Sequence, residues 1–521
     1  MSHSTITFLV LAAVVVVFTL DRIPVAIVAI GTALALWATG VLDLNQSLAG
    51  FGDPTVLFIG SLFVVSEALD ASGVTAWAGQ MLIEQVGESR TRLIVLMCLL
   101  VAALTALINV NGAVAALVPV VVVMAMRLGR RPAQLLMPLA FAAHAGSLLA
   151  LTGTPVNVII SESAKDAGVG AFGFFSFALV GIPLLAGTVA IILLFGERLL
   201  PDRQPRASSR NFSEHARTLV DTYALDDDPE TLMTKRSGVA EIVIPPRSEL
   251  IGELAYPGMV TDSGDLVVLA VQRNGEDLEP GDTTLAAGDS LLLQGSWGAL
   301  EHHLDDPSVL VVDSPEAVRR QSVPLGLGAW ESIGVLLAMV VLLATGAVPP
   351  AVAGLLGAGT LVLLGVLSID QAYRGISWTT VILVGGMISL STAMTVSGAA
   401  EKLANELVRI VGGHGGYALL AGLFVLTAVL GQLISNMATA LIVIPISLSA
   451  AHDVGVSPKP VLMCVCVSAA ASFLTPVATP ANLMVMGPAG YRFGDYWKLG
   501  LPLLALFGTV AIFLVPVFWS F

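Results

Sequence analysis

Long apolar runs, interrupted by short polar breaks, fill the first and last parts of the chain. A bilayer core of about 30 Å needs about 20 apolar residues per helix, so these runs predict transmembrane helices. In the first half the expected spans are 4–20, 23–42, 55–71, 92–108, 114–126, 134–150 and 172–196. The span 114–126 is short, and a polar break at Asn109–Asn111 separates it from 92–108. We expect these two spans to form a re-entrant hairpin, which leaves five crossings.

A different pattern fills the middle of the chain. Residues 200–237 are polar, include Asp226–Asp228, and predict a linker. From Gly238 the alternation of apolar and polar positions predicts a small α/β domain. Strands are expected at Val239–Ile244, Asp265–Gln272 and Ser290–Gln294, helices near Glu249–Leu254 and at Trp297–Leu304, and turns at Asn274-Gly275 and Gly288-Asp289. The expected domains are membrane parts at 1–199 and 330–521, linkers at 200–237 and 313–329, and the insert at 238–312.

Composition agrees with a polytopic membrane protein that carries one soluble insert. Of 521 residues, 56% are hydrophobic and 12% are charged, about half the charged fraction of an ordinary soluble domain. Residues 200–325 contain 22 acidic and 10 basic side chains, and so nearly all of the net charge of −14. The acidic balance argues against nucleic-acid binding. No nucleophile–base pair or metal cluster is apparent, so we expect neither an enzyme nor a cofactor. Cys98, Cys464 and Cys466 lie in apolar runs and are expected to be packing residues.

Arginine placement predicts the orientation. If the N-terminus is outside, the expected inside segments contain seven arginines and the outside segments only Lys165, which is a clear positive-inside bias. The arginines are Arg22, Arg90, Arg92, Arg127, Arg130, Arg131 and Arg198. The first run lacks a basic flank and a cleavage site, so we expect a retained helix. The insert is therefore expected in the cytoplasm.

The second half repeats the first with a constant shift in numbering. Thr154-Pro155-Val156-Asn157 matches Thr479-Pro480-Ala481-Asn482, and Asn111 matches Asn436. Because five crossings is an odd number, the second copy must run in the opposite orientation and end outside. We expect inverted repeats with about ten crossings and two re-entrant hairpins in the plasma membrane, an architecture that secondary transporters use to bind substrate near the midplane. A channel also permits repeats, but no charged ring or TVGYG-like filter is present.

Four polar breaks at membrane depth, two per repeat, are expected to line a cavity. The hairpin tips are Asn109–Gly112 and Ile434–Thr439, and the second breaks are Leu151–Asn157 and Leu474–Asn482. Each break ends at a helix N-terminus, which suits an anion without any buried Lys or Arg. Freed carbonyls with Asn and Thr oxygens suit a small cation such as Na⁺. The alternative is that Thr and Pro only kink the helices and Asn bonds the neighbouring backbone. Four breaks in matched pairs favour a site.

The motif Ser435-Asn436-x-x-Thr439, with Pro445 beyond it, and the paired Thr-Pro-x-Asn breaks resemble the divalent anion–sodium symporter family. This citrate-transporter-like family belongs to the ion transporter superfamily, and the resemblance covers both membrane halves. It implies a homodimeric, elevator-type carrier that moves a small divalent anion, usually with Na⁺. It also implies that the tips and second breaks form the sites. The residues carried over are Ser435, Asn436, Thr439, Thr475, Thr479 and Asn482, and in the first half Thr152, Thr154 and Asn157.

The first hairpin tip departs from this motif, with Asn109-Val110-Asn111 where the family usually has Ser-Asn-Thr. Asn111 lies eight residues before Pro119, whereas Asn436 lies nine before Pro445. Either a residue is missing, or Asn109 stands in the serine's place. The departure leaves the choice between sulfate, another oxyanion and a dicarboxylate open. The coupling ion Na⁺ is expected at the tip residues Asn109, Asn111, Ser435 and Asn436.

The insert has its own resemblance. Ile244-Pro-Pro-Arg-Ser-x-Leu-Ile-Gly252 and Leu285-x-x-Gly-Asp-x-Leu-Leu-Leu-Gln-Gly295 are similar to a TrkA-C domain, the C-terminal domain of RCK proteins. Such domains dimerise and sometimes bind small ligands, which implies a regulatory role, and a structural dimerisation or trafficking module is the equal alternative. Asp282 and Asp289 are expected to be turn residues rather than ligand contacts.

Four ionisable residues in or beside the spans need separate interpretation. Glu67 and Asp70 are expected to be interfacial or paired, and His144 to make a helix–helix contact rather than to couple protons. Glu162 has no predicted role. The sequence thus predicts a secondary symporter for a small anion driven by Na⁺. An arsenite permease or Na⁺/H⁺ antiporter of the same superfamily, and a ligand-gated channel, are the alternatives.

Overall fold

A computed structural model describes residues 2–20, 22–86, 89–127, 130–201, 234, 237–261, 263–273, 276–278, 283–304, 306, 308–312, 315, 325–411, 415–476 and 478–521. Nearly all of the expected linker 200–237, most of the second linker, the Asn274-Gly275 turn and Asp282 lie outside these residues. The chain divides into two compact units. One comprises Met1–Ala68, Leu82–Ser209 and Ile333–Phe521, and the other comprises Leu69–Met81 and Arg210–Ser332.

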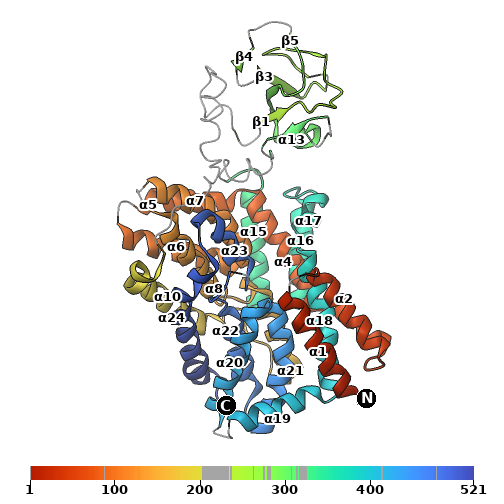
Figure 1. Ribbon diagram of the computed structural model, residues 1–521, viewed down its shortest axis with the longest axis vertical. Coiled ribbons are helices and arrows are strands. Elements are labelled where there is room, and N and C mark those ends of the chain that lie inside the picture. Colours follow the sequence, from red (N-terminus) through yellow and green to blue (C-terminus); the bar gives the residue numbers. More distant parts are fainter. Residues whose placement is uncertain are drawn as a thin grey trace. The chain divides into compact units, whose positions relative to one another are not determined.

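Two copies of one series of helices make up the membrane part (Figure 1). The first copy contains α1 (His3–Leu20), α2 (Val25–Ala38), α3 (Leu44–Leu48), α4 (Pro54–Ala71), α5 (Val74–Val86), α6 (Arg90–Leu107), α7 (Val110–Arg127), α8 (Leu136–Gly146), α9 (Pro155–Asp166) and α10 (Ala178–Leu199). The second contains α15 (Ala329–Thr345), α16 (Pro350–Leu363), α17 (Ile369–Gly375), α18 (Trp378–Val396), α19 (Ala399–Val411), α20 (Gly416–Leu433), α21 (Asn436–Val454), α22 (Pro458–Ala470), α23 (Pro480–Ala489) and α24 (Tyr496–Thr509), before a π-helical turn and α25 (Val515–Phe518). From α1 to α7, the starts of corresponding helices keep the numbering shift of the Thr-Pro motifs to within one position. The repeat therefore extends well beyond the motifs that revealed it.

The short helices α3 and α17 show how closely the copies agree. Asp43 caps α3 in a capping box with Gln46, and Ser368 caps α17 in a capping box with Gln371. Both members of the second box follow those of the first by the shift that relates Thr154 to Thr479. The box pairs two backbone N–H groups that a helix start otherwise leaves unsatisfied. Helices as short as these are not revealed by an apolar periodicity.

The boundaries of three expected spans differ from the prediction. The helix expected at 114–126 begins at Val110 and is as long as α6. It starts early because the side chain of Asn109 accepts a hydrogen bond from the backbone of Gly112 (2.8 Å), which caps the helix. The expected span 134–150 ends as a helix at Gly146, and the span expected from residue 172 begins as a helix at Ala178. In both cases the non-helical segment extends into residues that are apolar and were therefore expected to be helical.

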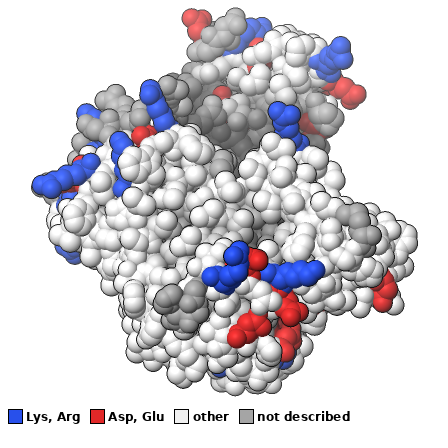
Figure 2. Space-filling model, turned by 60° about the horizontal axis from the view of Figure 1, so that its bottom comes forward, with Lys and Arg blue, Asp and Glu red and all other residues white. Residues whose placement is uncertain are grey.

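The surface of the helical unit is that of a membrane protein. Among the described residues, eight helices are long and apolar enough to cross a bilayer, and five shorter apolar helices accompany them. Apolar side chains such as Leu194, Leu363 and Val517 are largely exposed. In Figure 2 most of the surface in view is uncharged, and acidic and basic side chains gather in a few places, one of them near the lower centre. The expected class, a polytopic α-helical protein with a small inserted sheet domain, is confirmed.

The second unit contains an antiparallel sheet with the strand order β4-β3-β6-β1-β7. Its strands are β1 (Ser237–Val243), β3 (Leu266–Arg273), β4 (Glu276–Asp277), β6 (Ser290–Ser296) and β7 (Leu310–Val311), and β2 (Leu254–Ala255) pairs separately with β5 (Thr283–Thr284). Helix α13 (Trp297–His303) packs against β1 and β6. Alternate residues of these strands form the core with Trp297 and Leu300. The three predicted strands and the second predicted helix are thereby confirmed.

The helix expected near Glu249–Leu254 is wrong. The chain forms turns there and then enters β2. The hydroxyl of Ser248 accepts a hydrogen bond from the backbone of Leu250 (3.1 Å), which stabilises a turn instead of a helix. Gly252 follows with a φ of +95°, a conformation that a helix does not allow.

Candidate functional site

The second polar break of each repeat lies where the Thr-Pro motifs predicted. Helix α8 ends at Gly146 and α9 begins at Pro155, and in the second repeat α22 ends at Ala470 and α23 begins at Pro480. Thr154 caps α9 by accepting a bond from Val156 N (3.5 Å), and Thr479 caps α23 by accepting one from Asn482 N (3.4 Å). Proline fits the first turn because its missing N–H has no partner there.

A buried asparagine one turn into each helix holds the preceding loop. The carboxamide nitrogen of Asn157 donates to the carbonyls of Ser147 and Ala150, both at 2.8 Å. That of Asn482 donates to the carbonyls of Ser472 (2.8 Å) and Thr475 (3.1 Å). The partners in the second set are the repeat equivalents of those in the first. Both side chains are fully buried, so the two irregular loops are fixed in the same way.

The carboxamide oxygens of these asparagines face the opposite repeat. Asn157 Oδ1 accepts a hydrogen bond from Cys466 Sγ on α22 (3.1 Å). Asn482 Oδ1 lies 3.2 Å from His144 Nε2 on α8. Helix α9 also packs against α21 and α22, and α23 against α7 and α8. The helix that follows each second break therefore contacts the opposite repeat.

At the hairpin tips Asn109 corresponds to Ser435, and this shift in numbering is one position longer than the shift from Thr154 to Thr479. Asn109 precedes α7 and its side chain accepts a bond from Gly112 N, while Ser435 precedes α21 and accepts one from Ala438 N (3.3 Å). Of the two alternatives left open by the sequence, Asn109 stands in the serine's place. Val110 then corresponds to Asn436, and Asn111 corresponds to Met437 rather than to Asn436.

Threonine hydroxyls join each second break to the hairpin of its own repeat. Thr152 donates to the carbonyl of Ala106 (2.8 Å), and Thr475 donates to the carbonyl of Gln432 (3.4 Å). Each carbonyl belongs to the last turn of a hairpin helix, where helix geometry provides no N–H partner. The side chain of Gln432 adds a bond from Leu474 N (2.9 Å). In each repeat the second break is therefore hydrogen-bonded to the last turn of the helix that leads to the hairpin tip.

A small pocket opens among these elements. Its polar lining consists of His144, Ser147, Thr154 and Asn436, and its apolar lining of Val110, Val156, Cys466 and Ala470. Of the residues predicted for the site, Thr154 and Asn436 line the pocket. The other predicted residues are not part of the lining: Asn109, Asn111, Thr152, Asn157, Ser435, Thr439, Thr475, Thr479 and Asn482.

Ser147 is a lining residue that the sequence motifs did not indicate. Its counterpart is Ser472, at the shift that relates the Thr-Pro motifs. Each hydroxyl donates to the carbonyl three positions earlier, Ser147 to His144 (2.8 Å) and Ser472 to Ala469 (3.2 Å). The matched pair of serines was therefore a usable signal in the sequence.

The electrostatics of the pocket come from backbone dipoles. None of the eight lining residues is Asp, Glu, Lys or Arg. Asn436 is the first residue of α21 and Val156 the second of α9, so two helix N-termini border the pocket. Free N–H groups and the helix dipole at such termini stabilise an anion. The lining can therefore accept a small anion without a charged side chain.

Thr439 provides an oxygen that suits a cation. Its hydroxyl is buried and has no hydrogen-bond partner among the residues that the structure describes. A Cβ at Gly431 would lie 4.0 Å from Thr439 Oγ1 and 3.7 Å from Ser472 Oγ. Both hydroxyls therefore lie close to Gly431. Within the described residues no group of three His, Cys, Asp or Glu side chains is placed to hold a metal ion. A cation here would be bound by neutral oxygens, which suits Na⁺ better than a transition metal.

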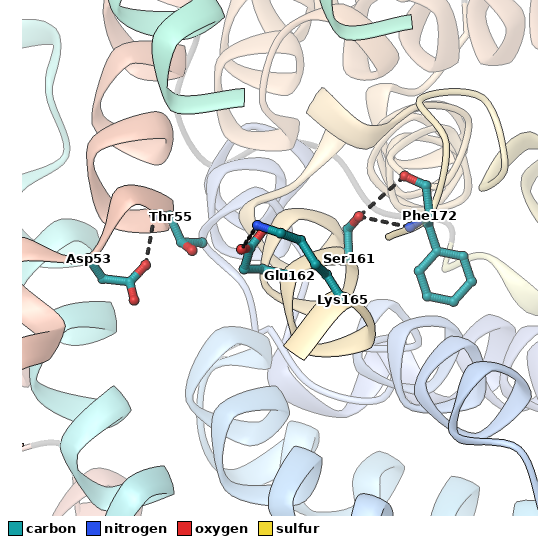
Figure 3. Close-up of polar contacts among 6 residues, drawn as sticks. All are labelled: Asp53, Thr55, Ser161, Glu162, Lys165 and Phe172. Carbon is teal, nitrogen blue, oxygen red and sulfur yellow. Dashed lines mark hydrogen bonds and ion pairs between the residues drawn. The ribbon is translucent and has the colours of Figure 1, made fainter. Parts of the chain in front are cut away.

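Glu67, Asp70 and Glu162 lie outside the pocket lining. Glu162 forms an ion pair with Lys165 (2.5 Å) at the end of α9, on the side of α9 that faces Asp53 at the start of α4 (Figure 3). Its neighbour Ser161 hydrogen-bonds the backbone of Phe172.

The other two acidic residues lie near the end of α4. Asp70 accepts a hydrogen bond from the Thr75 hydroxyl (2.8 Å). A Cβ at Gly375 would lie 2.6 Å from Glu67 Cγ, so Glu67 packs against the end of α17.

Comparison with known proteins covers nearly the whole chain. A model of the citrate transporter family matches residues 14–344 and 339–521. An uncharacterised transporter of Escherichia coli, YfbS, is 30% identical over 98% of both chains. An uncharacterised transporter of Synechocystis is 25% identical over 99% of this chain and 97% of its own. A protein of Chlamydomonas reinhardtii named sodium/sulfate cotransporter 1 is 28% identical over 48% of this chain and 29% of its own.

Proposed function

The chain belongs to the citrate transporter family, and from that premise we propose that it is a secondary active symporter that couples uptake of a small divalent oxyanion, sulfate foremost, to Na⁺. The observation that carries the proposal is the pocket between the repeats, which is bordered by two helix N-termini and has no Asp, Glu, Lys or Arg in its lining. Relatives from Chlamydomonas reinhardtii named sodium/sulfate cotransporters support the choice of anion and ion.

The anion would lie between Thr154 and Asn436. The hydroxyl of Thr154 and the carboxamide of Asn436 come from opposite repeats and both line the pocket. Backbone N–H groups at the start of α21 would add donors that the helix holds in place. The start of α9 would contribute its helix dipole, since Pro155 has no N–H and Val156 N is bonded to Thr154. A tetrahedral dianion presents acceptor oxygens in several directions, which matches donors that converge from two repeats.

Na⁺ would bind at the hairpin tips. The tip residues Asn109, Asn111, Ser435 and Asn436 offer side-chain oxygens. The hydroxyl of Thr439, buried without a partner among the described residues, lies next to the second tip. Because Asn109 replaces the serine and Asn111 falls one position beyond the expected place, the two cation sites would differ. We expect the second tip to bind more tightly.

Transport would follow an elevator mechanism in a homodimer. Each tip and its second break are joined by Thr152 or Thr475, so the loaded site would move as one body against the remaining helices. The insert, whose motifs resemble a TrkA-C domain, would regulate this movement through a small ligand. The orientation with both termini outside and the insert in the cytoplasm is part of the same proposal.

The test is uptake of labelled sulfate into proteoliposomes, with phosphate, succinate and citrate as competitors, with and without a Na⁺ gradient. We expect saturable uptake that collapses without Na⁺. Asn436→Ala should abolish uptake while the protein remains folded, and Asn405→Ala, on the exposed face of α19, should leave it unchanged. Sulfate uptake driven by a proton gradient would contradict coupling to Na⁺, and exchange of Na⁺ for protons without sulfate uptake would favour a Na⁺/H⁺ antiporter. Arsenite uptake would favour an arsenite permease, and unsaturable conductance would favour a channel.

A further inference from the structure

His144 interrupts the symmetry of the pocket. It lies three positions before Ser147, and the equivalent position before Ser472 is Ala469. The hydroxyl bonds of the two serines confirm this correspondence, because each serine donates to the carbonyl of the residue in question. The first repeat therefore places an imidazole where the second places a methyl group.

The imidazole of His144 is held in one orientation. Both carboxamide hydrogens of Asn482 go to loop carbonyls, so Asn482 presents its oxygen to His144. Nε2 of His144, 3.2 Å away, must carry the hydrogen and donate it. The same nitrogen lies 3.2 Å from Thr479 Oγ1. Phe473 packs edge-on against the ring, with centroids 5.8 Å apart, and His144 is only 2% exposed.

This orientation places His144 between the pocket and the second repeat. In the first repeat the capping threonine, Thr154, lines the pocket directly. Its counterpart Thr479 does not belong to the lining, and the residue that both lines the pocket and contacts Thr479 is His144. The place at which symmetry would open the pocket to Thr479 is therefore occupied by a side chain from the first repeat.

We propose that His144 sets the upper size of the transported anion by closing the half-site of the second repeat. The inference rests on the proposed function and deepens it, since it selects a compact oxyanion over a dicarboxylate. Thr479 and Asn482 then act as positioning residues that fix His144 and do not contact the anion. Differences of one side-chain group in a pocket change discrimination by roughly ten-fold to a few hundred-fold. A change from imidazole to methyl removes several ring atoms next to the anion.

The first test measures closure without any substrate. Thr479→Cys should react slowly with a small methanethiosulfonate reagent while His144 is present, and at least about ten-fold faster in the double variant Thr479→Cys/His144→Ala. Because the native Cys466 lines the pocket, the parent protein and His144→Ala, both without an added cysteine, provide the two background rates. Thr154→Cys, the lining counterpart, should react at a similar rate with and without His144. Equal reaction of Thr479→Cys in both backgrounds would overturn the inference, whatever the protein transports.

The second test measures selectivity in proteoliposomes. His144→Ala should lower the ratio of sulfate to succinate uptake by about ten-fold or more, as the KM for succinate falls and that for sulfate rises. His144→Gln keeps a donor and most of the volume, so it should retain the parental ratio. The matched control is His452→Ala, since the side chain of His452 is 92% exposed.

The outcomes separate the two proposals. An unchanged ratio in His144→Ala, with sulfate uptake intact, contradicts the inference but leaves the proposed function standing. Absence of sulfate uptake in the parent protein contradicts the proposed function, and the cysteine test still decides the role of His144.

Discussion

The two loop-holding asparagines allow a quantitative test of the repeat. Asn157→Leu and Asn482→Leu each keep most of the side-chain volume and remove two hydrogen bonds to loop carbonyls. A buried acceptor that loses its donor costs about 1–3 kcal/mol. Hydrogen bonds inside membrane proteins average about 0.6 kcal/mol, because the unfolded chain in the membrane also finds partners. Between these limits, two lost bonds should cost about 2–4 kcal/mol of unfolding free energy.

The geometry also predicts how the two variants compare. Their bonds to the loops have nearly the same lengths, 2.8 and 2.8 Å for Asn157 and 2.8 and 3.1 Å for Asn482. Each variant also loses a hydrogen bond from the opposite repeat, from the Cys466 thiol to Asn157 and from His144 Nε2 to Asn482. Because a thiol is a weak donor, Asn482→Leu should cost as much as Asn157→Leu or up to about 1 kcal/mol more. Asn482→Asp should cost more than Asn482→Leu, because a carboxylate would face two carbonyls that need donors and would repel them.

The assay is unfolding of the purified protein in mixed micelles by increasing SDS, followed by tryptophan fluorescence. Asn405→Leu, at an exposed position of α19, controls for the loss of an asparagine and should change the free energy by less than about 0.5 kcal/mol. The reasoning is refuted if both buried variants stay within that margin. It is also refuted if one costs several kcal/mol and the other nothing, since the loops would then be held differently.

Three further predictions concern other parts of the chain. A Cβ at Gly181 would lie 2.2 Å from the Leu148 carbonyl oxygen, and a Cβ at Gly500 would lie 2.4 Å from the Phe473 carbonyl oxygen. Gly181→Ala and Gly500→Ala should therefore each lower the melting temperature, because overpacking costs about 1–3 kcal/mol. Gly359→Ala, whose Cβ would meet no atom within 4 Å, should leave the melting temperature unchanged. In the insert, Arg273 donates to both carboxylate oxygens of Asp289 at 2.7 Å and holds the pKa of that carboxyl below its usual value. The resulting stability is present above the unfolded pKa of about 3.9 and is lost as pH falls through the lower folded pKa. The protection of β6 amides in the full chain, relative to their intrinsic exchange rates, should therefore fall at acid pH, and Asp289→Asn should remove that pH dependence and lower the protection at neutral pH. Thr152→Val breaks the bond to Ala106 and should raise the half-saturating concentrations of Na⁺ and sulfate together by several-fold, whereas Thr154→Val should raise that of sulfate alone; equal effects of the two variants on Na⁺ would contradict the link between tip and break.

The features of the site that the sequence could predict are those that leave a local chemical signature. Proline after threonine marks a helix start, because proline lacks the N–H that a first turn leaves unpaired, and both Thr-Pro motifs begin helices. The matched asparagines three positions after each threonine were also visible. Their hydrogen bonds to the preceding loops were not, since those depend on the path that each loop takes before its helix.

Two aspects of the site could not be predicted by aligning the two halves of the chain without a gap. The shift from Asn109 to Ser435 is one position longer than the shift from Thr154 to Thr479, so aligning Asn111 with Asn436 placed the first tip one residue out of register. His144 was expected to be a helix–helix contact, and it is one, through Asn482 and Thr479. Its place in the pocket lining follows only from the packing of α8 against α23.

The insert shows the same division between local signature and tertiary context. Alternating apolar residues predicted β1, β3 and β6 because one face of each strand is buried in the core. The short segment after Pro245-Pro246 had the composition of a helix. Ser248 and Gly252 override that composition by a side-chain hydrogen bond and a positive φ, which act at single positions and leave no periodicity.

The uncharged lining of the pocket has a consequence for electrical measurements. Moving one elementary charge through a membrane potential of about 100 mV involves about 2.3 kcal/mol. A pocket lined without any Asp, Glu, Lys or Arg side chain has no such charge in its lining when it is empty, so in the proposed symporter the lining would add no charge to that of the cargo. The net charge moved per divalent anion then equals the number of Na⁺ ions minus two.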